Sequence, residues 1–216
     1  KKNIGKFEFS FLNLTYKEID NNSVGSLFQN WLRLWFEKNK IFYRTPANTQ
    51  ESPDFFLKKK DDKDGLLEIK TFYKSPDFDI KSWTAFLTAM IEKPYQIFSD
   101  YLIFHYNINS NRNEFSLENI YLKKISEISR PMTEQSTVPF KINVQYKKGV
   151  IYNLRPLGNK DLQEKKSPYF KDHVEFLTAV QETIDMYKKS DDEFRNNKWL
   201  ELVKNNYKKI IRKELF

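Results

Sequence analysis

The chain has 216 residues, of which 39% are hydrophobic and 16% aromatic, so it can fill a sizeable core and is not expected to be disordered despite 31% charged residues. It contains no cysteine and only two histidines, which excludes disulfide bonds, thiolate zinc sites and cysteine nucleophiles, and argues against a Ser-His triad. Its net charge of +8 favours a polyanionic partner, most commonly nucleic acid, although lysines that serve only solubility are the alternative.

Membrane insertion and secretion are not expected. No run of about 18 apolar residues is present, and the first residues, KKNIGKFEFSF, do not resemble a signal peptide. We therefore expect a cytoplasmic protein made of a single domain. Its core would span about 23–130, and a hairpin and helices would follow over about 131–216.

Periodicity and turn signals predict the elements of the first part of the chain. Apolar residues recur at helical spacing after Asn22 and Ser23, either of which is a suitable N-cap, so a helix is expected over about 23–38. A short strand over 41–45 is expected next. The segments 52–60 and 65–73 are then predicted to be two strands, joined through the hairpin dipeptide Asp64-Gly65.

The second part of the chain continues with alternating elements. A helix interrupted at Pro94 is expected, followed by a strand whose nearly continuous apolar run indicates burial. These two elements cover 82–99 and 100–108. A strand that turns into a short helix is expected over 120–129, and a hairpin that turns near Lys148-Gly149 is expected over 140–156. Two C-terminal helices follow over 169–189 and 193–215, with a polar linker at 188–193. This order predicts a mixed α/β fold.

The stretch SPDF occurs twice, at 52–55 and at 75–78. In the first copy Asp54 opens a strand, and the returning strand carries Glu68 and Lys70, which point to one face because they are two residues apart. Ile69 points the other way, into the core, which leaves its backbone carbonyl free to face the same edge. The hairpin is therefore expected to bring two carboxylates and one ammonium together.

These groups suit the hydrolysis of a phosphodiester. Two carboxylates can hold Mg²⁺ through oxygen ligands, and the cation lowers the pKa of a bound water. Lys70 would orient or deprotonate the attacking water and stabilise the developing charge. The alternative is an ordinary surface hairpin with scattered charges.

The second SPDF copy lacks this geometry. It contains its own D-x-K at Asp79 and Lys81, but a single residue separates Asp77 from Asp79, so no hairpin can form between them. All three residues would lie along one extended segment. We therefore expect Asp77 to cap the following helix or to line a loop, and we assign the site to Asp54.

With its apolar flanks and D-G turn, "SPDFFL…DGLLEIKTF" resembles the PD-(D/E)xK nuclease superfamily, which includes most type II restriction endonucleases. The resemblance implies a core of a mixed central sheet flanked by helices, here with C-terminal helices appended. Many relatives carry Gly-x-x-x-Glu on the first helix as a further acid near the metal. The corresponding residues here are Gly25 and Gln29. A metal role for Gln29 is therefore in doubt, and it could hold a water or lie on the solvent side of the helix.

A longer run over about 50–157, including "EKPYQIFSDYLIFHY" and "KKGVIYNLRP", resembles the NgoBV/NlaIV-type restriction enzymes. This resemblance implies a Mg²⁺-dependent enzyme that cuts double-stranded DNA at a short palindromic site of the GGNNCC kind. A palindromic site calls for a C2 homodimer, because protein symmetry mirrors site symmetry. A cognate DNA methyltransferase would be its functional, not physical, partner.

Residues that contact DNA are expected on and after the second hairpin, at Lys147, Lys148, Asn153 and Arg155. Arg to guanine and Asn to adenine are the usual base contacts, whereas the lysines are equally suited to phosphates. His105, in an apolar strand, is expected to be a core residue. Two rival functions remain open at this point: a repair or junction-resolving nuclease on the same core, and a catalytically silent DNA-binding protein.

Overall fold

The chain forms two compact units in the computed structural model. The first unit comprises Lys1–Pro76 and Asp100–Lys123, and the second comprises Asp77–Ser99 and Lys124–Phe216. The described residues are 4–6, 8–11, 14–16, 21–48, 51–109, 114–132, 140–158, 161–162, 168–187, 194 and 198–216. The polar linker expected at 188–193 lies outside them. The expected organisation as one domain stays a prediction.

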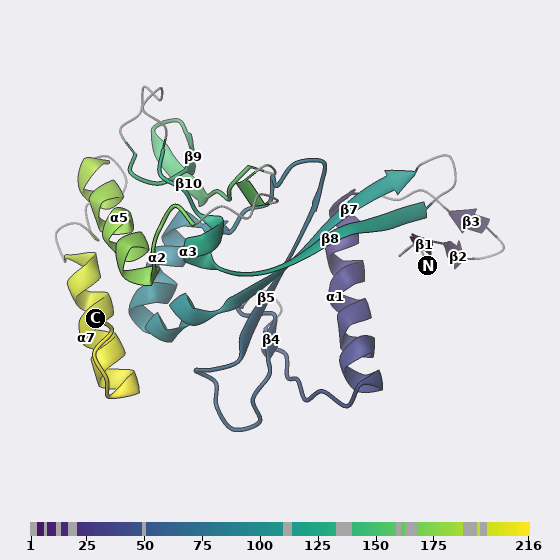
Figure 1. The fold of residues 1–216 in the computed structure, drawn as a ribbon, viewed down its shortest axis with the longest axis horizontal. Helices are drawn as coiled ribbons and strands as arrows, with labels where there is room; N and C mark the ends of the chain where they lie inside the picture. Colours follow the sequence, from purple (N-terminus) through teal and green to yellow (C-terminus); the bar gives the residue numbers. More distant parts are fainter. Residues whose placement is uncertain are drawn as a thin grey trace. The chain divides into compact units, whose positions relative to one another are not determined.

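The first unit is a five-stranded sheet with a long helix on one face (Figure 1). The strands run in the order β1-β8-β7-β5-β4, and the bounds are β1 Ile4–Lys6, β4 Phe55–Phe56, β5 Leu66–Tyr73, β7 Asp100–Asn109 and β8 Glu114–Lys124. The sheet is mixed, because β5 pairs parallel to β7 whereas β4 pairs antiparallel to β5. A separate antiparallel pair is formed by β2 (Phe9–Phe11) and β3 (Leu14–Tyr16).

Helix α1 (Asn21–Lys38) matches the helix predicted over about 23–38. Its buried residues are spaced four apart, so they form one stripe that packs on the sheet; they are Val24, Phe28, Leu32 and Phe36. Phe28 stacks on Phe104 of β7 with ring centroids 4.6 Å apart, and Phe36 meets Phe55 of β4 edge-on at 5.5 Å. These contacts hold α1 across β7 and β4, which lie on either side of β5 in the sheet.

The predicted hairpin is present, although its first strand is short. Phe55 pairs with Leu67 and Phe56 with Leu66, which sets the register of β4 on β5. Gly65 has a φ of +65°, a left-handed conformation that glycine adopts without steric cost. The strand expected over 41–45 is wrong in extent: it is a single bridge between Arg44 and Phe56.

The second unit packs helices with a small sheet. The helices are α2 Trp83–Glu92, the 3₁₀ turn η1 Pro94–Phe98, α3 Ile125–Ile128, α5 His173–Met186 and α7 Trp199–Ile211. The predicted interruption at Pro94 is confirmed, since α2 ends at Glu92. Both predicted C-terminal helices are present as α5 and α7, which lie side by side (Figure 1). The Trp199 indole of α7 donates to the Leu87 carbonyl of α2 at 3.0 Å and so joins these two helices.

The three-stranded sheet of the second unit has the order β6-β10-β9, with β6 at Lys81–Ser82, β9 at Val144–Lys147 and β10 at Val150–Leu154. The predicted turn between β9 and β10 is confirmed. Lys148 and Gly149 both have positive φ, 51° and 81°, as a two-residue hairpin turn of the primed type requires. In the part of the chain that the structure describes, the helices are too short or too polar to cross a membrane.

Candidate active site

Asp54 stands where helix α1 and the hairpin meet. It directly precedes β4, and its Oδ2 accepts a hydrogen bond of 2.7 Å from the backbone N–H of Ile69 on β5. Its Oδ1 accepts a second bond of 2.7 Å from the side-chain amide of Gln29 on α1. The carboxylate is therefore held by one backbone donor and one side-chain donor from separate elements.

Glu68 and Lys70 share one face of β5, as predicted from their spacing. Lys70 Nζ lies 3.2 Å from Glu68 Oε1, and these side chains are only 19% and 14% exposed. The other oxygen, Glu68 Oε2, accepts a hydrogen bond of 2.8 Å from the Ser52 hydroxyl. Between them Ile69 points away into the core under α1, where it is 9% exposed. The hairpin thus brings together the residues that the sequence predicted to converge.

The charges of the cluster perturb Asp54. Burial, followed by the negative charge of Glu68, raises the pKa of Asp54 from its ordinary 3.8 to about 6. The hydrogen bond from Ile69 and the cations Lys70 and Arg33 oppose this rise without cancelling it. Two half-buried carboxylates that repel each other form a site that a cation would stabilise.

The donor set fits a hard divalent cation. Among the described residues, no group of three or more His, Cys, Asp or Glu side chains gathers as a metal site. The oxygen atoms of Asp54, Glu68 and the neighbouring backbone are of the kind that hard divalent cations accept as ligands, with waters completing the coordination. Softer metals that prefer nitrogen or sulfur ligands do not match these groups.

Two residues near the cluster were not found from the sequence. Tyr101 on β7 is in register with Glu68, and burial, then the charges of Glu68 and Asp54, raises its pKa well above the usual range. Arg33 lies one turn after Gln29 on α1, with its Cζ 5.9 Å from the ring centroid of Phe55. Its positive charge acts on Asp54, whose pKa it lowers. The four-residue spacing of Gln29 and Arg33 was a usable signal for a shared helix face, whereas nothing local indicated the parallel pairing that brings Tyr101 to Glu68.

The second SPDF copy forms no comparable site. Asp77 was expected either to line a loop or to cap the following helix. It is exposed in the loop after β5, and the N-cap of α2 is Ser82. Asp79 forms an ion pair with Arg155, and Lys81 pairs along β10 with Leu154. The segment therefore runs extended, without a returning strand that carries a second carboxylate.

Comparison with known proteins identifies the relatives of this chain. A family model described as NgoBV restriction endonuclease matches residues 2–216. The chain belongs to this family. The type II restriction enzyme NlaIV of Neisseria lactamica is 36% identical over 188 residues, which cover 86% of this chain and 74% of the relative. The type II restriction enzyme NgoBV of Neisseria gonorrhoeae is 35% identical over 113 residues, which cover 50% of this chain and 62% of the relative.

A solved structure extends the likeness to the fold. The NlaIV restriction endonuclease structure matches 99% of this chain and 84% of its own chain, with a TM-score of 0.82 and 32% sequence identity. The predicted restriction-endonuclease-like core with C-terminal helices is thereby confirmed. The resemblance that the sequence indicated over about 50–157 extends over nearly the whole chain, including the C-terminal helices.

In this member of the NgoBV family, the residues expected to contact DNA fall into two groups. Lys147 and Lys148 are exposed at the β9–β10 turn, and the Lys147 ammonium lies 5.3 Å from the ring centroid of Tyr152. Asn153, by contrast, is 4% exposed and its amide donates to Gln145 Oε1 at 3.2 Å, so its side chain is committed within the hairpin. Arg155 is half-buried and is engaged by Asp79.

His105 lies on β7 with its ring stacked on Phe72 at a centroid distance of 4.5 Å. Burial lowers its pKa, and the charge of Glu118 opposes this shift. His105 is only partly buried, so it is not the core residue that was expected, and its ring packs on Phe72 at the edge of the core.

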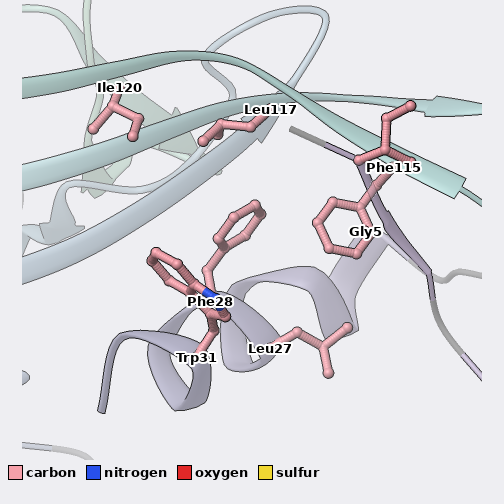
Figure 2. A pocket seen from close by; sticks show the side chains of 8 residues that line it. Gly5, Leu27, Phe28, Trp31, Phe115, Leu117 and Ile120 are labelled. Carbon is pink, nitrogen blue, oxygen red and sulfur yellow. The ribbon is translucent and has the colours of Figure 1, made fainter. Parts of the chain in front are cut away.

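An apolar pocket of about 450 Å³ lies between α1 and the strands β1 and β8, and none of the active-site residues lines it (Figure 2). Leu27, Phe28 and Trp31 of the helix face Leu117 and Ile120 of the strand. Its lining side chains are hydrocarbon apart from the indole nitrogen, so it holds no groups for hydrolysis.

Proposed function

We propose that this member of the NgoBV family hydrolyses phosphodiester bonds in double-stranded DNA with Mg²⁺ as cofactor, at a short palindromic site of the GGNNCC kind. The observation that carries the proposal is the meeting of Asp54, Glu68 and Lys70 at the mouth of one hairpin. A cytoplasmic homodimer with C2 symmetry would match a palindromic site. A cognate methyltransferase would protect the host DNA.

Asp54, Glu68 and the carbonyl of Ile69 are the proposed metal ligands. In a strand, the N–H and the C=O of one residue point toward the same edge. Because the Ile69 N–H is directed at Asp54, its carbonyl oxygen also faces the edge where that carboxylate lies. A bound Mg²⁺ would lower the pKa of a coordinated water and neutralise charge on the phosphate.

Lys70 would orient the attacking water and stabilise the negative charge that develops on the phosphate. Its ammonium is already drawn to the cluster by Glu68 Oε1, 3.2 Å away. This contact supports the role because it keeps a cation on the same strand face as a metal ligand. The half-buried setting strengthens its field relative to that of an exposed lysine.

Gln29 would orient Asp54 rather than bind the metal. It occupies the position where the superfamily resemblance calls for an acid, but its amide donates to Asp54 Oδ1. A third carboxylate here would add to the repulsion that already raises the pKa of Asp54. A neutral donor holds the ligand without that cost.

We assign the DNA contacts to the β9–β10 hairpin. Lys147 and Lys148, both exposed, would contact phosphates. Arg155 would read a guanine by exchanging the carboxylate of Asp79 for the base edge. Asn153, buried against Gln145, would support the hairpin that presents these residues, and a direct contact with adenine would require it to leave that partner.

Incubation of the chain with a plasmid of known sequence and Mg²⁺ tests the proposal. Discrete fragments are expected, and their ends define the recognition site. A smear, or a preference for branched DNA, would indicate a non-specific or junction-resolving nuclease instead. Intact plasmid, together with DNA binding that weakens steeply as salt rises, would contradict a nuclease and indicate a DNA-binding protein.

A further inference from the structure

Ser52 directly precedes Pro53 and Asp54 and contacts the active-site cluster, although the motif assigns it no role. Its hydroxyl donates to Glu68 Oε2 at 2.8 Å, and both groups are partly buried. We propose that Ser52 is a positioning residue that holds the carboxylate of Glu68 in the orientation needed to bind the divalent cation. This inference rests on the proposed function, because it takes Glu68 to be a metal ligand.

The two carboxylates are held in different ways. Asp54 has a short side chain and accepts a hydrogen bond from the backbone of Ile69, a donor that the sheet itself fixes. Glu68 has one more rotatable bond, and in the described part of the chain the partners of its carboxylate are the side chains of Ser52 and Lys70. Fixing a longer side chain costs more conformational entropy, so Glu68 depends more on its partners.

Lys70 alone is a poor anchor for Glu68. Its ammonium sits on a flexible four-carbon stem and is a point charge without directional preference. In the proposed function it also serves the water and the phosphate, so its contact with Glu68 must loosen during the reaction. Without Ser52, the attraction of Lys70 would turn the carboxylate along the strand toward itself.

Ser52 is well placed to resist that movement. It precedes Pro53, which is buried, and Phe55, which is fully buried in the core beneath α1. The backbone that carries the hydroxyl is therefore held by packing. A hydrogen bond to an ionised acceptor is about twice as strong as a neutral one, and partial burial increases its effect.

The test compares Ser52→Ala with Ser75→Ala in the full chain. Ser75 is the equivalent serine of the second SPDF copy and is exposed, so it controls for the local sequence. Two readouts are taken: the shift in melting temperature during a Ca²⁺ titration without DNA, and the Mg²⁺ concentration that gives half-maximal plasmid cleavage. Loss of an outer partner of a metal ligand typically weakens metal binding by about 10–100-fold.

We expect Ser52→Ala to raise both half-saturating concentrations at least about tenfold, while cleavage at saturating Mg²⁺ recovers most of its rate. Ser75→Ala should leave both unchanged, and Ser52→Thr, which keeps the hydroxyl, should restore them. Unchanged half-saturation in Ser52→Ala, whatever its melting temperature without metal, would overturn the inference. If Glu68→Gln also leaves cation binding unchanged, the proposed metal site itself is wrong, and the two failures are thereby distinguished.

Discussion

Gln29 and Asp54 are 25 positions apart in the sequence, yet the amide of one donates to the carboxylate of the other at 2.7 Å. This bond connects helix α1 to the start of β4. It means that the orientation of the proposed metal ligand depends on how the helix packs on the sheet, and not on the hairpin alone.

Removing that donor should reduce cleavage without dismantling the helix. Gln29→Leu removes the donor and keeps a side chain of comparable size, and we expect plasmid cleavage at limiting Mg²⁺ to fall by about 10–100-fold. Asn30→Leu changes the neighbouring, exposed position of α1 and is the matched control. Equal losses in both variants would mean that the effect comes from the helix surface rather than from Asp54.

Substitution of the doubled aspartates separates the two SPDF copies. Asp54→Asn should lower the cleavage rate by at least about a hundredfold, because it removes one charged metal ligand and metal activation of water supplies several kcal/mol. DNA binding should persist, because the loss of a negative charge favours contact with phosphate. Asp77→Asn makes the same change at an exposed loop and should keep most activity. The reverse result would place the active site at the second copy.

The stability of the chain without divalent cations should depend on pH through Asp54. Its pKa is about 6 in the folded chain against an ordinary 3.8, so the folded state binds more protons between these values. The stabilising contribution is complete below pH 3.8 and is lost as the pH rises through 6. At pH 8, Asp54→Asn should therefore be more stable than the parent, by on the order of 1–3 kcal/mol.

Chemical denaturation of both proteins at pH 4 and pH 8 measures this difference. The gap between them should narrow toward pH 4, where Asp54 is protonated in the folded chain and close to its ordinary pKa of 3.8 in the unfolded chain. Gln29 can turn its amide to accept from the new Asn, so the substitution does not leave two donors facing each other. A gap that stays constant with pH would show that the titration of Asp54 does not contribute.

Arg155 should contribute to site-specific binding more than to folding. If it reads a guanine, Arg155→Ala should weaken binding at the cognate site by about 1–3 kcal/mol and change non-specific affinity much less. Asp79→Ala removes its ion-pair partner and should leave specific binding intact or tighter. Because the pair is partly exposed, neither change should cost more than about 1 kcal/mol of stability. Equal binding losses on all DNA sequences would make Arg155 a phosphate contact.

The turn of the active-site hairpin should not tolerate a side chain. Gly65 has a φ of +65°, and a Cβ there would lie 3.0 Å from Lys58 Cγ. Gly65→Ala should therefore lower the free energy of unfolding by about 1 kcal/mol. Gly158 has only Asp161 Oδ2 nearby, at 3.8 Å, so Gly158→Ala is the control in the same thermal or chemical melts. No destabilisation at Gly65 would mean that the turn adopts another conformation.

Local sequence determined much of the secondary structure of this protein. Helix α1, the interruption at Pro94 and the Lys148-Gly149 turn all depend on residues within a few positions of one another. The prediction of a tight turn at Asp64-Gly65 was wrong, because this dipeptide lies at the end of the longer connection over 57–65 between Phe56 and Leu66. The pairing of Asp54 with Glu68 and Lys70 was nevertheless predictable. The return of the chain from Phe56 to Leu66 places the two strands side by side, and the alternation along β5 assigns Ile69 to the core and its neighbours to the site.

Only the tertiary structure decided which groups surround that site. Gln29 reaches Asp54 because α1 packs across the sheet, and Tyr101 reaches Glu68 because β7 pairs parallel to β5. Asn153, whose sequence context suggested a base contact, is buried instead. Parallel pairing and helix docking join residues far apart in the chain, and their geometry follows from the packing of the whole core, which no short stretch of sequence contains.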